Sequence, residues 1–328
     1  MASINVSASN ASGSGTGGIV TLTMNPALDV STSTATVMSE HKLRCGPSRI
    51  DPGGGGVNVS RTIHSFGGEA LAVYAVGGLT GATYSALLEA EGVPSLAVSI
   101  AGTTRESFTV NETGSGEQFR FVLQGPEFSE PEWRSCLEAL DAAVLPGGYV
   151  VASGSLPPGV PADFYARVTR LAHAHGARSI VDSSGEALAE AVAEGVYLVK
   201  PSRRELGELV GRDLVSEQLE VEAASELVSR GSAQLVALTL GNAGAVLASA
   251  EGVIRLPVPQ VEVLSTVGAG DAFLGAFVWR LSQGHDPQSA FRTAVAAGSA
   301  TAARAATEMC SLAEVESLEA LLPEAVRY

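Results

Sequence analysis

The sequence predicts an α/β protein built on one doubly wound, mostly parallel β-sheet with helices on both faces. From Ile19 onward, short runs rich in β-branched residues alternate with helical segments, which is typical of parallel strands joined by crossover helices. The length of 328 residues suits one large α/β domain with a small appended element. We therefore expect a single domain over residues 18–328.

The predicted elements follow one another along the chain in the order that this fold requires. We expect strands at 19–24, 70–76, 94–100, 149–152, 178–182, 196–199 and 234–239. We expect helices at 57–66, 81–91, 130–143, 161–175, 216–230, 269–283, 287–305 and 311–321. Residues 1–17 are rich in Ser, Gly, Ala and Asn and lack the features of a signal peptide, so we expect a disordered N-terminal extension.

Two stretches break the alternation of strand and helix. Residues 30–50 and 105–124 have the period-2 pattern of extended chain, and the second contains a Gly-rich turn at 114–116. They predict a small separate β-sheet. Such a sheet leaves open edges and an apolar face, which a substrate-covering lid or a dimer interface would cover. We expect a lid, and a homodimer formed through its strands.

Composition and charge exclude several classes of function. The formal net charge of −15 disfavours sequence-independent binding to nucleic acid or to an anionic membrane. No apolar run approaches the roughly 18 residues that span a bilayer. Three scattered cysteines are too few for a disulfide framework. We expect a cytoplasmic protein that acts on small molecules.

The segment STVGAGDAF (265–273) carries the strongest chemical signal and directly precedes a helical run. Backbone amides of Gly268, Ala269 and Gly270 at a helix start, together with the helix dipole, suit a transferring phosphate group. Asp271 in the first turn would accept the proton of an attacking alcohol. On local chemistry alone, Asp271 could equally be a favourable first-turn acid of an ordinary helix.

This segment and six others resemble the ribokinase-like, PfkB family of sugar kinases over nearly everything after Ile19. The others are NPALDVS (25–31), DPGGGGVNVSRTIHSFGG (51–68), SGSLPPGV (153–160), VDSSGEAL (181–188), LVKPSRREL (198–206) and LTLGNAGAVL (238–247). Within the family, KLRC (42–45), TRES (104–107) and SGEQFRFV (115–122) resemble members that act on fructose 6-phosphate.

The resemblance implies a ribokinase-like fold and transfer of the ATP γ-phosphoryl group to the C1 hydroxyl of fructose 6-phosphate, with Mg²⁺. Tagatose 6-phosphate and fructose 1-phosphate remain alternative acceptors, because such isomers differ by very few contacts. A sugar-phosphate-binding regulator that has lost turnover is an alternative of another class.

The resemblance also implies roles for individual residues. For the sugar phosphate it implies Asp29, Lys42, Arg44, Gly54, Gly55, Asn58, Arg105 and Ser155. For the nucleotide it implies Lys200, Ser202, Glu205, Thr239, Gly241, Gly244 and Thr266, with Glu205 ordering Mg²⁺ through water. Lys42 and Lys200 are the only lysines of the chain, which suggests that both positions need a compact, mobile charge.

Two positions depart from the family pattern. Ser202 stands where the family has Asn, so we expect a weaker or differently hydrated metal site. Arg304, in the segment 301–311, stands where an Asn is usual. Members of the family often bind K⁺ beside the Gly-Ala-Gly-Asp turn and this later segment, so Arg304 weakens the expectation that K⁺ binds here.

Overall fold

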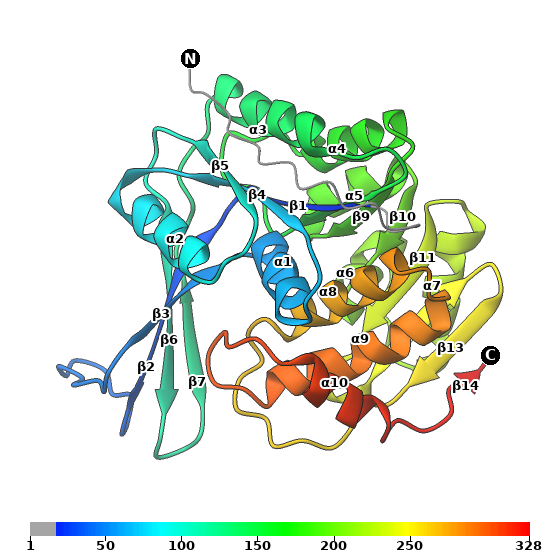
Figure 1. Ribbon diagram of the computed structural model, residues 1–328. Coiled ribbons are helices and arrows are strands. Elements are labelled where there is room, and N and C mark those ends of the chain that lie inside the picture. The colour runs from blue at the N-terminus through cyan, green and yellow to red at the C-terminus, as the bar shows by residue number, and fades with distance from the viewer. Residues whose placement is uncertain (1–17) are drawn as a thin grey trace.

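The computed structural model describes residues 18–328, so the predicted N-terminal extension lies outside the described residues. Its centre is a ten-stranded sheet in the order β14-β13-β12-β11-β10-β9-β8-β1-β4-β5 (Figure 1). The strands from β5 to β11 pair in parallel, and the last three add antiparallel. In chain order they are β1 (Ile19–Thr23), β4 (Leu71–Val76), β5 (Ser95–Ser99), β8 (Tyr149–Ser153), β9 (Arg178–Asp182), β10 (Val196–Val199), β11 (Ala233–Thr239), β12 (Ala245–Ser249), β13 (Gly252–Leu256) and β14 (Val326–Arg327).

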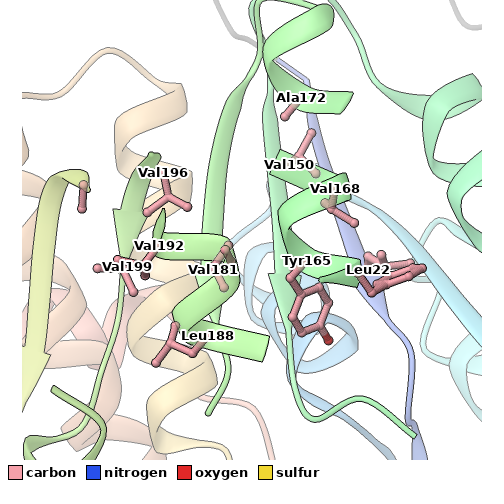
Figure 2. Close-up of a cluster of buried hydrophobic side chains, with 14 of the residues drawn as sticks. Leu22, Val150, Tyr165, Val168, Ala172, Val181, Leu188, Val192, Val196 and Val199 are labelled. Carbon is pink, nitrogen blue, oxygen red and sulfur yellow. The ribbon is translucent and has the colours of Figure 1, made fainter. Parts of the chain in front are cut away.

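Helices cover both faces of this sheet, as the sequence predicts. The bounds are α1 (Gly55–Ser65), α2 (Gly78–Ala90), α3 (Glu130–Ala143), α4 (Phe164–Ala174), α5 (Gly185–Ala193), α6 (Arg203–Val210), α7 (Glu217–Ser229), α8 (Ala269–Ser282), α9 (Pro287–Ala302) and α10 (Leu312–Glu319). Side chains alternate between the faces along each strand. Val150 therefore packs with α3, α4 and α5, whereas Val151 packs with α1, α8 and α9. Figure 2 shows part of the first cluster, where Val150 lies beside Val168 and Ala172, and Val181 lies near Leu188 and Val192.

Four further strands form a separate sheet that projects from the main body (Figure 1). We call this the small sheet; its order is β3-β2-β6-β7. It consists of β2 (Ala27–Thr34), β3 (Arg49–Gly53), β6 (Arg105–Glu112) and β7 (Gln118–Val122). The expected small sheet is thus confirmed, although β2 begins before residue 30 and residues 35–48 are mostly irregular.

The sequence prediction misses some short elements. It omits α5 and α6, which have nine and eight residues, and the antiparallel strands β12, β13 and β14. Helices this short present only two turns, too few for a clear period of 3.6 residues. Among residues 18–328, no helix is both long and apolar enough to cross a membrane.

Phe291 provides a test of the packing between α8 and α9. Its side chain is fully buried, with ring centroids 5.9 Å from Phe273 and 6.1 Å from Phe277. We expect Phe291→Ala to lower the free energy of unfolding by about 3–5 kcal/mol, because it leaves a cavity in a core that cannot fully collapse. Leu79→Ala is the control, since Leu79 is 88% exposed, and should change it by less than about 0.5 kcal/mol. Equal effects of both variants in urea denaturation would contradict this description.

Candidate active site

The small sheet and the carboxyl ends of the central strands enclose a cavity of about 320 Å³. Carboxyl ends of parallel strands are where α/β sheets of this kind bind ligands. Strands β2, β6 and β7 supply one wall, and the ends of β8 and β9 with the starts of α1 and α8 supply the other. The lining includes six residues expected for the sugar phosphate (Asp29, Gly54, Gly55, Asn58, Arg105, Ser155), together with Glu205, Gly268 and Asp271.

The four-glycine run Gly53–Gly56 lets α1 begin directly against the sheet. A Cβ atom on Gly53 would lie 2.0 Å from Asp29 Oδ2, and one on Gly55 would lie 2.2 Å from Ser153 Oγ. Gly54 also has φ 129°, a conformation that side chains disfavour. In the first turn of α1, the Val57 N–H donates to Thr23 Oγ1 at 2.8 Å. The glycines are therefore required by close packing, and Gly54 and Gly55 bring the backbone to a cavity that a ligand could enter.

Asp271 lies half-buried in the first turn of α8 and faces the cavity. Gly268, the residue before this helix, has φ 79° and makes the sharp turn into it, and no side chain caps the helix start. Asn58 Nδ2 donates a hydrogen bond of 2.8 Å to Asp271 Oδ2. Burial and the nearby Asp182 carboxylate raise the pKa of Asp271 to about 7, against the opposing effects of Asn58 and Lys200. This carboxyl is poised to exchange a proton near neutral pH.

Lys200 is buried between two carboxylates at the same helix start. Its Nζ lies 3.1 Å from Asp182 Oδ2, and a Cβ atom on Gly270 would lie 3.3 Å from Nζ. Burial lowers the pKa of Lys200, but Asp182 and Asp271 outweigh this effect, so the net shift is upward. Lys200 therefore carries a positive charge next to the α8 amides.

Ser202 and Glu205 form a reciprocal cap at the start of α6. Ser202 Oγ accepts the Glu205 N–H at 3.3 Å, and Glu205 Oε2 accepts the Ser202 N–H at 2.8 Å. Serine is as good a residue as asparagine at this N-cap position. The replacement therefore preserves the helix start, and it leaves the Glu205 carboxylate at the cavity wall.

The expected nucleotide loop lies next to this cap but outside the cavity. Thr239 forms a parallel bridge with Ser202, and its N–H donates to the Pro201 carbonyl at 3.0 Å. Gly244 has φ 100°, and a Cβ atom there would lie 2.1 Å from the Leu256 carbonyl oxygen. This close approach alone requires a glycine in the turn between β11 and β12. Thr239, Gly241, Gly244 and the exposed Thr266 do not line the cavity.

Asp29 and two arginines form the small-sheet side of the cavity. Burial raises the pKa of Asp29 to about 6, although Arg105 and Arg120 pull it downward. Arg105 donates hydrogen bonds to the carbonyls of Asn25 at 2.9 Å and Leu123 at 3.0 Å, which hold its guanidinium in place. The cavity wall opposite the α8 start is therefore cationic.

Of the three cations expected to gather here, only Arg105 reaches the cavity. Lys42 and Arg44 are exposed on the irregular segment 35–48 and do not line it. Arg120 lines it instead, beside Thr109, its partner in the pairing of β6 and β7. Sequence reasoning gave Arg120 no role, although the period-2 pattern of 115–122 could have placed it on the same face as Gln118.

Asp182 is the second functional candidate that sequence reasoning passed over. It ends β9, lines the cavity and pairs with Lys200. The signal was present in the sequence, because a charged residue at the end of a buried strand lies at the carboxyl edge of the sheet.

Comparison with curated proteins finds relatives along almost the whole chain. ATP-dependent 6-phosphofructokinase isozyme 2 of Mycobacterium tuberculosis (strain ATCC 25618 / H37Rv) is 44% identical, covering 93% of this chain and 90% of the relative. The protein of the same name from Escherichia coli (strain K12) is 41% identical, covering 93% and 98%. A 1-phosphofructokinase of Bacillus subtilis (strain 168) is 31% identical, also covering 93% and 98%.

The fold is shared with solved structures of known kinases. Phosphofructokinase-2 from Escherichia coli in complex with fructose-6-phosphate superimposes with a TM-score of 0.88 at 40% identity, covering 93% of this chain and 98% of that one. Escherichia coli phosphofructokinase-2 has also been solved with potassium and as a tetrameric inhibited form. The description "pfkB family carbohydrate kinase" matches residues 23–313. The predicted family and the ribokinase-like fold are confirmed, and this chain belongs to the pfkB family of carbohydrate kinases.

Proposed function

We propose that the protein is an ATP-dependent 6-phosphofructokinase that phosphorylates the C1 hydroxyl of fructose 6-phosphate, with residues 18–328 as its single kinase domain and the small sheet as its lid. The observation that carries the proposal is the position of Asp271. Asn58 holds its carboxylate at the start of α8, across the cavity from a cationic wall. A binding protein would have no use for a titrating carboxylate beside a phosphate site, whereas a kinase needs a base there.

Asp271 supplies the base for the attacking hydroxyl. With a pKa of about 7, it is partly ionised at neutral pH and can take the C1 proton as the new P–O bond forms. The protonated carboxyl is then also stable, because burial disfavours the charge. A well-placed base of this kind contributes roughly 10²- to 10⁴-fold to the rate.

The start of α8 and Lys200 supply the stabilisation of the transferring group. The amides of Gly268, Ala269 and Gly270 lie at the uncapped positive end of the helix, with Lys200 Nζ close to Gly270. Negative charge on the phosphoryl oxygens in the transition state would meet these donors, of which the Ala269 N–H also makes a long bond of 3.5 Å to the Thr266 carbonyl.

The sugar phosphate would lie between the α1 start and the small sheet. Asp29 can accept hydrogen bonds from two hydroxyls, and the amides of Gly54 and Gly55 allow the sugar to approach the backbone. Arg105 and Ser155, with Arg120 nearby, would bind the 6-phosphate by charge-assisted bonds. Lys42 and Arg44 would contribute only if their segment moved or if a second copy supplied them.

ATP and Mg²⁺ complete the proposal. Among the described residues, no group of three or more His, Cys, Asp or Glu side chains could hold a metal ion. That suits Mg²⁺, which keeps several waters and binds largely through substrate phosphates. Glu205 would contact it through water, with Thr239, Gly241, Gly244 and Thr266 on the nucleotide side. In bound form the ion would neutralise phosphate charge.

The loop between α9 and α10 does not favour a bound potassium ion. Arg304 forms ion pairs with Glu308 and Glu314 there, so this segment already contains a fixed cation where the family pattern has Asn. The structure of Escherichia coli phosphofructokinase-2 with potassium concerns a protein that is 40% identical.

Turnover with a panel of acceptors tests the substrate. We expect ADP release with Mg-ATP to be fastest for fructose 6-phosphate, relative to tagatose 6-phosphate, fructose 1-phosphate and fructose. Asp271→Asn should lower kcat by at least about 10²-fold, since the amide cannot take the proton. A preference for fructose 1-phosphate would favour a 1-phosphofructokinase, as in the Bacillus subtilis relative. Ligand-induced stabilisation without any turnover would favour the non-catalytic regulator.

The same variant predicts a pH-dependent change of stability. The folded pKa of Asp271, about 7, exceeds the ordinary value of 3.8, so between pH 4 and 7 the folded state holds a proton that the unfolded state has lost. Its stabilising contribution is complete below about pH 4 and disappears as the pH rises through 7. We therefore expect the Tm of Asp271→Asn minus that of the unmodified protein to grow from pH 4 to 7 and then level off. A constant difference would contradict the raised pKa.

We propose that two copies associate through the small sheet. Phe121 and Val122 on β7 are 52% and 62% exposed, and Ile50 on β3 is 43% exposed. Exposed apolar side chains on an open sheet favour self-association. The Escherichia coli relative has a tetrameric inhibited form, so association of more than two copies would also fit the proposal.

Light scattering tests this association. We expect the unmodified protein to have at least twice the mass of the chain, and Phe121→Glu to shift it toward the monomer, because a charge cannot be buried there without a partner. Leu321→Glu is the control, since Leu321 is 70% exposed on the main body. A strictly monomeric, active unmodified protein would contradict the proposal.

A further inference from the structure

Arg61 is a buried cation beneath the active site to which the mechanism above assigns no role. It lies one turn after Asn58 on α1 and is only 3% exposed. Burying a charge this completely is costly unless every donor finds a partner. Both oxygens of Glu91 accept from it at 2.6 Å, and the Pro52 carbonyl accepts at 3.1 Å. Asn58 Oδ1 accepts a further bond at 3.2 Å.

The bond to Asn58 has a consequence for the catalytic carboxylate. A guanidinium group can only donate hydrogen bonds, so the Asn58 atom that faces Arg61 must be the amide oxygen. The amide nitrogen then faces the opposite side, where it donates to Asp271 Oδ2 at 2.8 Å. Turning the amide over would set its NH₂ group against Arg61 and its oxygen against Asp271, and both contacts would be repulsive.

We propose that Arg61 is a positioning residue that fixes the orientation of the Asn58 amide and thereby keeps a hydrogen-bond donor on Asp271. The inference rests on the proposed role of Asp271 as the base. It assigns Arg61 an effect on the reaction although Arg61 does not line the cavity. Arg61 also donates to the Thr307 carbonyl at 3.5 Å, which ties α1 to the loop before α10.

Several other charged groups lie around Arg61 and Asp271 and also affect the pKa of Asp271. Asp182 on β9 and Asp29 on β2 raise the pKa of Asp271, whereas Lys200 after β10 lowers it. Asp51 on β3 lies 4.0 Å from Arg61, and Glu91 follows α2. A variant that keeps the positive charge at position 61 leaves these Coulombic effects largely in place, so it isolates the hydrogen bond to Asn58.

Arg61→Lys is such a variant, because lysine keeps the charge but cannot serve Glu91, Pro52 and Asn58 together through a planar fork. We expect the pKa of Asp271 to rise by about one unit, the effect of losing one hydrogen bond to a charged group. The pKa is measured by carboxyl ¹³C NMR of aspartate-labelled protein, with the signal assigned by comparison with Asp271→Asn. This NMR measurement does not depend on turnover, so its result is valid even if the proposed substrate is wrong.

If the unmodified protein turns over fructose 6-phosphate, the pH profile of kcat should move with the NMR pKa. At pH 7 we expect kcat of Arg61→Lys to be about five-fold lower, with recovery by about pH 9, because a base with a higher pKa is ionised only at higher pH. A lower kcat with an unshifted profile would mean that Arg61 acts only on stability, and it would overturn the proposal.

Arg255→Lys is the matched control. Arg255 Nη1 pairs at 2.9 Å with Glu220, whose side chain is 3% exposed, so this is also a largely buried ion pair, and neither residue lines the cavity. We expect both lysine variants to lower the Tm and only Arg61→Lys to shift the pKa of Asp271. A shift in both variants, or in neither, would overturn the proposal.

Asn58→Leu keeps the proposal falsifiable if Arg61→Lys does not fold. Leucine is close to asparagine in shape and adds no charge, and it offers no donor to Asp271. We expect the pKa of Asp271 to rise by at least as much as the lysine variant predicts, about one unit. An unchanged pKa would show that the Asn58 amide does not donate to Asp271, and the proposed role of Arg61 would fall with it.

Discussion

The hydrogen bond between Asn58 and Asp271 is the contact on which the rest of the site depends. Asp271 faces two other carboxylates, those of Asp182 and Asp29, and burial disfavours its charge. Without opposing groups it would stay protonated at neutral pH and could not act as a base. The Asn58 hydrogen bond and the charge of Lys200 lower this pKa. The pKa near 7 is therefore a balance, with burial and like charges on one side and Asn58 and Lys200 on the other.

That balance requires backbone geometry that only particular residues allow. Asn58 reaches Asp271 because α1 begins with glycines packed against Ser153 and Asp29, where any Cβ atom would overlap. On the other side, Gly268 takes a left-handed conformation that turns the chain into α8. The glycines thus set the distance between the starts of α1 and α8. This distance determines whether the Asn58 side chain can reach Asp271.

The sequence predicted the architecture of the main body well, because that architecture depends on local patterns. Asp271 follows a glycine turn at a helix start, and Asn58 and Lys200 lie in segments that resemble the family. The remaining errors concern groups that become neighbours only through long-range packing. Arg61 meets Glu91 across α1 and α2, and no periodicity in either segment indicates that pair. Lys42 and Arg44 were expected in the cavity, but their segment forms no strand that would direct them there.

The distribution of charge between the two sheets explains why the cavity needs both of them. The main body contributes Asp271, Asp182 and Glu205 to the lining, whereas both arginines of the lining, Arg105 and Arg120, come from the small sheet together with Asp29. A phosphorylated sugar matches this polarity, because its anionic end is drawn toward the arginines and its hydroxyl end toward the carboxylates. The charges on the two sheets therefore favour one orientation of the acceptor. If the small sheet moved away from the main body, the arginines would be separated from the carboxylates. The charges would then no longer favour one orientation of the sugar phosphate.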